Sequence, residues 1–127
     1  MISHLIGLPY DIHNNNGVNC WGLVAAVYKL LGNEVKDFPA KSNDHAVIAA
    51  VFAAAFASGE HGFHRVDSPN DYDIVVFNRP TKFGKIYHCG IMLAGKVIHS
   101  TSATGGVVYQ SLDQAKSGFT GVEFWRK

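Results

Sequence analysis

The stretch from Asn19 to Gly32, NCWGLVAAVYKLLG, limits most strongly what this chain can fold into. Its apolar side chains recur with the period of an α-helix. They form one stripe made by Cys20, Leu23, Val24, Val27, Leu30 and Leu31. Asn19 is a competent N-cap, and Gly32 is well suited to follow the last helical turn. The spacing therefore predicts a helix over 20–31 that begins at a cysteine.

An alanine-rich segment predicts a second helix over about 44–58. Ser42, Asn43 and Asp44 supply capping side chains before it, and Gly59 ends it. Within this segment, residues 46–57 form the longest apolar run of the chain. The run is well short of the roughly 20 residues that cross a bilayer, so we expect a buried core helix and no membrane insertion.

The second half of the chain is rich in β-branched and aromatic residues, separated by turn residues. It predicts five strands, at 72–77, 86–93, 96–101, 106–112 and 122–127. Ala94 and Gly95 make a tight turn between the second and third of them. Helices followed by strands indicate an α+β fold, with N-terminal helices packed on one face of a roughly five-stranded antiparallel meander. No linker divides the chain, so we expect one domain over 1–127.

The composition narrows the classes of function. Hydrophobic residues make up 47% of the chain and charged residues 17%, which is typical of a globular domain. The formal net charge is +1 and no cluster of Lys and Arg occurs, which argues against nucleic acid as a partner. The start of the chain lacks the basic segment of a signal peptide, so we expect synthesis in the cytoplasm without secretion by that route. Cys20 and Cys89 are interpreted as free thiols, although a single disulfide is compatible with the sequence.

The histidines outside the strands do not predict a metal site. His61 and His64 are three residues apart, and His4 and His13 lie near the N-terminus. None of these spacings matches a zinc-binding pattern, so we expect solvated histidines and no metal or other cofactor.

Cys20 occupies the predicted first residue of a helix. The backbone N–H groups there have no partner within the helix, and they carry the positive end of the helix dipole. Both effects favour the thiolate and lower the pKa of the cysteine. The same N–H groups can hold a developing oxyanion. A cysteine at this place is nevertheless also compatible with a small buried hydrophobe, because free cysteines are often buried.

Two histidines on the predicted hairpin could serve such a cysteine. With a turn at 94–95, residue 93 pairs with 96 and residue 88 with 101, so His99 faces position 90. His88 and position 90 share one face of the strand, which brings the rings of His88 and His99 within reach of each other. Gly90 leaves space beside His88. The alternative is a pair of core histidines without a chemical role.

Several stretches together resemble the NlpC/P60 family of papain-like cysteine peptidases, which cut peptides of the bacterial cell wall. The family pattern has Pro-Tyr, then Asp-Cys-Ser-Gly-Leu-Val, then Gly-Asp-Leu-Val-x-Phe, His-x-Gly-Ile-Tyr and Ile-His-Ala. The matching stretches here, in the same order, are GLPYD at 7–11, NCWGLV at 19–24, YDIVVF at 72–77 and HCGIMLAGKVIHS at 88–100. The resemblance implies a papain-like fold and a peptidase of peptidoglycan stem peptides.

The resemblance also implies a role for each matching residue. Cys20 would be the nucleophile, His88 the base and His99 the third, orienting residue. Tyr10 matches a tyrosine that sits against the cysteine and assists the oxyanion region. Asn19 replaces the usual Asp, which is associated with gripping the free amine of an N-terminal L-alanine.

Two further departures concern aromatic residues and the biological setting. Trp21 replaces the usual Ser, and we expect an apolar or stacking wall for substrate there. Tyr72 replaces a usual Gly, which we interpret as a minor loop change.

The form NCWGLV resembles the phage tail-associated branch of the family, the lambda tail protein K group. That likeness implies synthesis in the host cytoplasm, a place in the virion tail with other tail proteins as partners, and action at the bacterial cell wall.

Three other readings of the same residues stay open at this point. One is a catalytically weak or silent module for tail assembly. Another is an acyltransferase or a different amide hydrolase on the papain-like scaffold, because a Cys-His pair serves any chemistry that passes through a thioester. A secreted toxin effector would use the same chemistry in another context.

Overall fold

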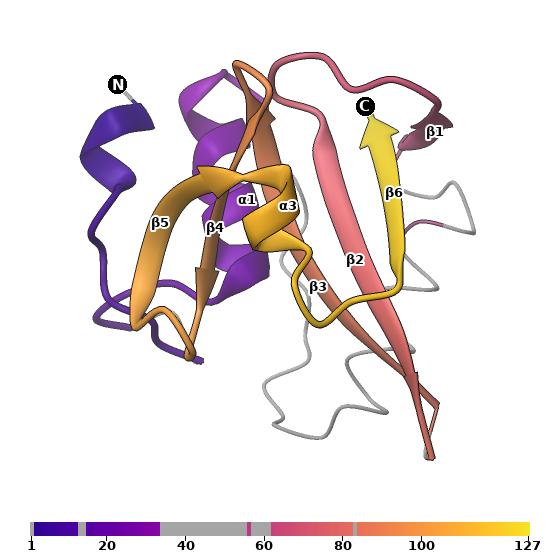
Figure 1. Cartoon of the computed structure of the whole chain (residues 1–127). Helices are drawn as coiled ribbons and strands as arrows, with labels where there is room; N and C mark the ends of the chain where they lie inside the picture. Colours follow the sequence, from indigo (N-terminus) through magenta and orange to yellow (C-terminus); the bar gives the residue numbers. More distant parts are fainter. Residues whose placement is uncertain (1, 13–14, 34–55, 57–61, 83) are drawn as a thin grey trace.

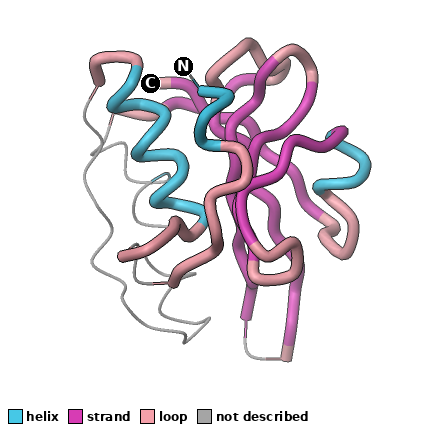
Figure 2. Tube along the Cα trace, turned by 90° about the vertical axis from the view of Figure 1, so that its left-hand side faces the viewer, coloured by secondary structure: helices cyan, strands magenta, loops and turns pink. Residues whose placement is uncertain are grey.

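The computed structural model describes residues 2–12, 15–33, 56, 62–82 and 84–127. A six-stranded sheet forms its centre, with helix α1 on one side of the sheet and the short helix α3 on the other (Figures 1 and 2). The elements are η1 (Ile2–Leu5), α1 (Cys20–Leu30), β1 (His64–Val66), β2 (Ile74–Thr81), β3 (Gly84–Leu93), β4 (Lys96–Thr101), β5 (Gly106–Ser111), α3 (Leu112–Ala115) and β6 (Gly121–Arg126).

The sheet is antiparallel throughout, in the order β1-β6-β2-β3-β4-β5. The predicted α+β class and the antiparallel sheet are confirmed, and each predicted strand is present with its ends shifted by at most four residues. The prediction of a simple five-strand meander is wrong. The last strand, β6, crosses back to lie between β1 and β2, and β1 is a sixth strand.

Helix α1 begins and ends close to where the sequence predicts. The side chain of Asn19 caps it by accepting a hydrogen bond from the Gly22 N–H at 2.7 Å. Gly32 follows the helix with a φ of +81°, a conformation that glycine adopts without strain. The predicted helix over 44–58 lies almost wholly outside the described residues. Phe56 is the one described residue of that range, and its side chain is buried.

The sheet is buried on both faces. On the α1 face, Leu23 and Val27 of the helix pack against strand residues that include Ile74 and Ile91. On the opposite face, Val75 and Phe77 form a second cluster that is covered by α3 and by the chain around Phe119; its other members are Met92, Val97, Ala115, Leu112, Val122 and Phe124. Burial on both faces explains why IVVF at the start of β2 is a continuous apolar run and does not alternate with polar residues.

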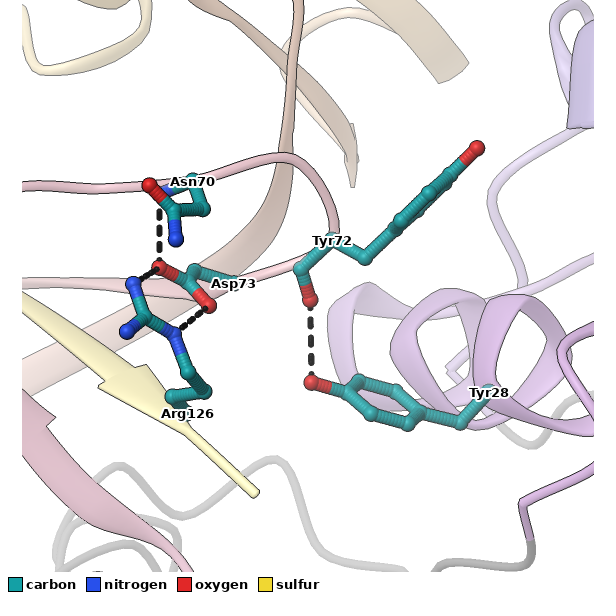
Figure 3. A network of polar contacts seen from close by, with 5 residues as sticks. All are labelled: Tyr28, Asn70, Tyr72, Asp73 and Arg126. Atoms are coloured by element: carbon teal, nitrogen blue, oxygen red, sulfur yellow. Dashed lines mark hydrogen bonds and ion pairs between the residues drawn. The ribbon is translucent and has the colours of Figure 1, made fainter.

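An ion pair between the buried carboxylate of Asp73 and the partly exposed side chain of Arg126 connects the start of β2 to the end of β6 (Figure 3). The Asp73 carboxylate receives hydrogen bonds from Nε and Nη2 of Arg126 at 2.9 and 2.8 Å and from the Asn70 N–H at 2.7 Å. The neighbouring Tyr72 carbonyl accepts a hydrogen bond from the Tyr28 hydroxyl at 2.9 Å, which ties this turn to α1. The contacts hold the first residues of β2 in register under the helix.

Candidate active site

Cys20 is the first residue of α1, as the sequence predicts. The side chain of Asn19 fixes this helix start in two directions. Its Oδ1 caps the helix at Gly22, and its Nδ2 donates to the Ile12 carbonyl at 2.9 Å. The helix start is therefore tied to the preceding loop, and Cys20 is held at the end of the helix where the backbone N–H groups lack helical partners.

The loop before the helix packs closely along the sheet edge. Pro9 forms an isolated bridge with Gly106 of β5, and Tyr10 forms one with Val18. A Cβ atom at Gly17 would collide with the Pro9 carbonyl, so this position needs glycine. The Ser100 hydroxyl of β4 donates to the Val18 carbonyl at 2.7 Å. The loop thus carries Tyr10 toward Cys20.

Tyr10 and Cys20 interact electrostatically. The pKa of Tyr10 is raised, first by burial and then by the negative charge of the Cys20 thiolate, with a smaller effect from Asp11. The Tyr10 hydroxyl therefore stays protonated and is able to donate a hydrogen bond. Its predicted role in the oxyanion region stays a prediction.

The two predicted histidines meet across the β3–β4 hairpin. The register pairs Leu93 with Lys96, as expected, but pairing ends at Ile91 and Ile98, so the expected pair of residues 88 and 101 does not form. The strands diverge beyond that point (Figure 1). His88 Nε2 and His99 Nδ1 nevertheless lie 2.8 Å apart, which confirms that the rings are within reach of each other.

A third polar side chain extends this pair. His99 Nε2 lies 2.8 Å from Oε1 of Gln110 on β5. His88, His99 and Gln110 therefore form a continuous hydrogen-bonded chain over three neighbouring strands. Both histidines are buried. Because His99 occupies Nε2 of His88, the nitrogen of His88 that remains for Cys20 is Nδ1.

The surroundings of Cys20 favour its thiolate. The pKa of Cys20 is well below its usual value, because the Cys89 thiol donates a hydrogen bond to the sulfur and His88 adds a further hydrogen bond and its charge. The Cys89 backbone contributes as well, and burial opposes these effects. The pKa of Cys89 is raised by burial and by the neighbouring Cys20, so Cys89 remains a thiol. Both cysteines are free, as interpreted from the sequence.

Burial also sets the charge of His99. Its pKa is lowered, mainly by burial and also by the charge of His88, while Gln110 and Cys20 act in the opposite direction. His99 is therefore neutral near pH 7 and can accept a hydrogen bond from His88.

Two phenylalanine rings hold His88 from the side of the second apolar cluster. The ring centroids of Phe77 and Phe119 lie 5.8 and 5.9 Å from that of His88, with interplanar angles of 18° and 14°. The two phenylalanine centroids are 5.6 Å apart and their planes are tilted by 31°, so the three rings form a compact triangle. This packing limits rotation of His88 about its side-chain bonds.

The structure changes the interpretation of the two other predicted substrate contacts. Trp21 is only 5% exposed and packs edge-on against Phe56 and Phe63, at centroid distances of 6.0 and 6.5 Å. The ring of Trp21 therefore packs mainly into the core, and its contact with substrate stays a prediction. The side chain of Asn19 uses both its oxygen and its nitrogen within the protein, so its position is explained by the helix start.

Sequence reasoning missed three residues of this site: Cys89, Gln110 and Phe119. Cys89 follows His88 directly in the sequence. Because neighbouring side chains of a strand point to opposite faces, the side chain of Cys89 lies on the α1 face of the sheet, where Cys20 also lies. Gln110 becomes a neighbour of His99 through the β4–β5 register, which pairs Val97 with Gln110 and His99 with Val108. That register is a property of the paired strands, and the turn residues at 102–105 alone do not fix it. Phe119 reaches His88 from the loop before β6, for which the sequence offered no signal.

The described part of the chain offers neither a metal cluster nor a membrane-spanning helix. Its His, Cys, Asp and Glu side chains form no group of three or more with the arrangement of a metal site. No helix among the described residues has the length and hydrophobicity to cross a membrane.

Comparisons with known proteins agree with the geometry. The model of the NlpC/P60 family matches residues 7–126. A solved structure, the NlpC/p60 domain of the peptidoglycan hydrolase SagA, superposes with a TM-score of 0.57 at 18% identity, covering 99% of this chain and 92% of that one. Comparison with curated proteins finds no match. The family model spans nearly the whole chain and includes Cys20, His88 and His99, and the chain belongs to the NlpC/P60 family.

Proposed function

We propose that the protein is a cysteine peptidase that hydrolyses amide bonds in the peptide stems of bacterial peptidoglycan. The observation that carries the proposal is the arrangement of a low-pKa cysteine beside His88, which is itself hydrogen-bonded to His99. Family membership and the likeness to a peptidoglycan hydrolase domain support the choice of substrate.

The proposed reaction begins with the proton of Cys20 on Nδ1 of His88. The thiolate attacks the carbonyl carbon of the scissile amide and forms a tetrahedral intermediate. The N–H groups at the start of α1 and the Tyr10 hydroxyl stabilise its oxyanion. His88 then donates its proton to the departing amine, which leaves a thioester on Cys20.

The second half of the reaction returns the enzyme to its starting state. His88, now neutral, removes a proton from a water molecule, and the resulting hydroxide attacks the thioester carbonyl. The C–S bond breaks, the peptide leaves with a new carboxylate, and the proton on His88 again faces the Cys20 thiolate. His99 supports His88 by accepting a hydrogen bond from its Nε2–H throughout.

Mass spectrometry of purified peptidoglycan fragments tests this function. The wild type should release new peptide fragments, whereas Cys20→Ala and His88→Ala should release none. His4→Ala is the matched control, because His4 is an exposed histidine in η1. Full cleavage by Cys20→Ala would refute the assignment. Transfer of the peptide to an added amine, in place of hydrolysis, would show an acyltransferase.

A finer part of the proposal concerns where the enzyme acts. We place it in a phage tail, where it would open the wall locally during entry, after synthesis in the host cytoplasm. The support is the resemblance of the sequence around Cys20 to the tail-associated branch of the family. Detection of the protein in purified virions by peptide mass spectrometry tests this placement. Its absence from intact virions, with activity retained, would favour a cell-borne enzyme or a secreted effector.

A further inference from the structure

The amide of Gln110 is the last member of the hydrogen-bonded chain that begins at His88. Its oxygen lies 2.8 Å from His99 Nε2, and the His99 Nδ1 lies 2.8 Å from His88 Nε2. Gln110 comes from β5, which is separated from β3 by β4. The hydrogen bonds of the glutamine therefore reach His88 through the ring of His99, and the chain leads from Gln110 toward the candidate nucleophile through two imidazole rings.

The chemistry of an amide oxygen fixes the direction of every hydrogen bond in this chain. A carbonyl oxygen only accepts, so His99 Nε2 carries the proton of that bond. A neutral imidazole has one N–H, which leaves His99 Nδ1 as an acceptor. The bond between the rings is then donated by His88 Nε2–H. Consequently Nδ1 of His88 is the position at which a proton is gained or lost beside Cys20.

We propose that Gln110 is a positioning residue that selects the Nε2–H tautomer of His99 and thereby aims Nδ1 of His88 at the sulfur of Cys20. The inference rests on the proposed role of His88 as the base. In this proposal Gln110, which lies outside the Cys-His-His set, determines which nitrogen of His88 transfers the proton.

The alternative tautomer shows why the selection matters. If His99 carried its proton on Nδ1, this N–H would face His88 Nε2, and His88 would have to present an unprotonated Nε2 to it. An imidazolium at His88 could not do so, because both of its nitrogens carry protons. The thiolate–imidazolium pair would then lose the hydrogen bond that supports it. The amide of Gln110 excludes this arrangement without adding a charge to the site.

The neutrality of Gln110 also matters for His99. The titratable groups that face His99 are His88 on β3 and Cys20 on α1, and Gln110 on β5 is uncharged. Tyr10 is not among the groups that shift the pKa of His99, and it stays protonated. A carboxylate in place of the amide would favour a second proton on His99. That proton would occupy Nδ1 and remove the acceptor for His88.

Two substitutions of Gln110 separate positioning from packing. Gln110→Met keeps a similar volume and removes the acceptor, so kcat should fall by about tenfold or more at every pH with little change in KM. Gln110→Glu keeps an acceptor for the Nε2–H. It should retain activity at alkaline pH and lose it on the acid side at a higher pH than the wild type. Gln114→Met is the matched control, because the side chain of Gln114 bonds only to Ser111 among the hydrogen bonds that the structure gives it.

The closing experiment needs no substrate. Two-bond ¹H–¹⁵N correlation spectra of the full chain identify the tautomer of each histidine, and the pH dependence of iodoacetamide alkylation reports the Cys20 thiolate. We expect the Nε2–H tautomer at His99 in the wild type and in Gln114→Met. Gln110→Met should mix the tautomers and move alkylation to higher pH.

The results distinguish an error in the role of Gln110 from an error in the proposed substrate. An Nδ1–H tautomer at His99 in the wild type, or unchanged spectra and alkylation in a folded Gln110→Met protein, would overturn the inference. The expected tautomers together with an inability to cleave peptidoglycan would instead overturn the proposed substrate and leave the role of Gln110 standing.

Discussion

The thiol of Cys89 on β3 donates a hydrogen bond to Cys20 at the start of α1, and this contact is the largest single influence that lowers the pKa of Cys20. The two cysteines are far apart in the sequence and meet on the helix-covered face of the sheet. Cys89 remains a thiol, whereas Cys20 is favoured as a thiolate.

Replacement of Cys89 by valine should weaken the thiolate. Valine has a similar volume but donates no hydrogen bond, so the pKa of Cys20 should rise toward its ordinary value. The rate of iodoacetamide alkylation, measured against pH, should therefore reach half its maximum at a higher pH than in the wild type. Cys20→Ala defines the background of the assay. A midpoint at or below that of the wild type would contradict the assigned hydrogen bond.

Asn19→Asp should harm the site, although Asp is the more common family residue. Aspartate caps a helix as well as asparagine does, but its oxygen would face the Ile12 carbonyl where Nδ2 now donates. The new charge would also oppose the thiolate of Cys20. We expect a loss of about 1–3 kcal/mol in the free energy of unfolding and alkylation shifted to higher pH.

Urea unfolding and the alkylation profile of Asn19→Asp measure these two effects separately. Asn15→Asp, on an exposed part of the preceding loop, is a control for added charge. An Asn19→Asp protein with wild-type stability and a lower alkylation midpoint would show that the loop contact to Ile12 is dispensable.

The backbone at Tyr72 has a φ of +71°, a region that disfavours all residues with a Cβ atom. Tyr72→Gly and Tyr72→Ala both remove the ring, but only glycine relieves the backbone. Tyr72→Gly should therefore be more stable than Tyr72→Ala by about 1 kcal/mol in urea unfolding. At Lys29, an exposed position within α1, the same two substitutions should rank in the opposite order.

The Asp73–Arg126 pair should make stability depend on pH in the acid range. Burial alone would raise the pKa of Asp73, but Arg126 and the Asn70 N–H hold it below its ordinary value of 3.8. As the pH falls, Asp73 therefore binds a proton in the unfolded chain before it does so in the folded protein. The stabilisation from the Asp73–Arg126 pair is complete above about pH 4, and it is lost as the pH falls through the pKa that Asp73 has in the folded protein.

Urea unfolding between pH 6 and pH 2 measures this loss. Asp73→Asn should be less stable than the wild type at pH 6, and its stability should fall less steeply below pH 4. Asp113→Asn is the matched control, since Asp113 forms an exposed pair with Lys116. Equal slopes for the wild type and Asp73→Asn would refute the assignment.

The part of this molecule that could be predicted from sequence is the part governed by local patterns. The period of α1, its cap at Asn19 and the turn at 94–95 are local, and together they place Cys20 and bring His88 beside His99. Strand β1 was missed because its three residues are mostly exposed and carry no alternation of apolar side chains. Helix α3 was missed although Ser111 and Gln114 form a capping box, because the strand signal before it continued to Leu112.

The remaining features depend on tertiary contacts that a single sequence does not reveal. Trp21 is buried because Phe56 and Phe63 surround it, and neither contact follows from the helix that carries Trp21. Gln110 reaches His99 only through the β4–β5 register. The replacement of a family glycine by Tyr72 looked minor in sequence, whereas the structure places it at a positive φ.

The position of β6 governs when the molecule can assemble during synthesis. Strand β6 leaves the ribosome after all the other described elements, yet it occupies an interior place in the sheet, beside β2, and brings Arg126 to the carboxylate of Asp73. Until then β2 has an unpaired edge, and the Phe119 ring that packs on His88 is also missing. A nascent chain therefore has Cys20 and both histidines before it has the fold that aligns them, so competence for chemistry should arise only after β6 has left the ribosome and paired with β2.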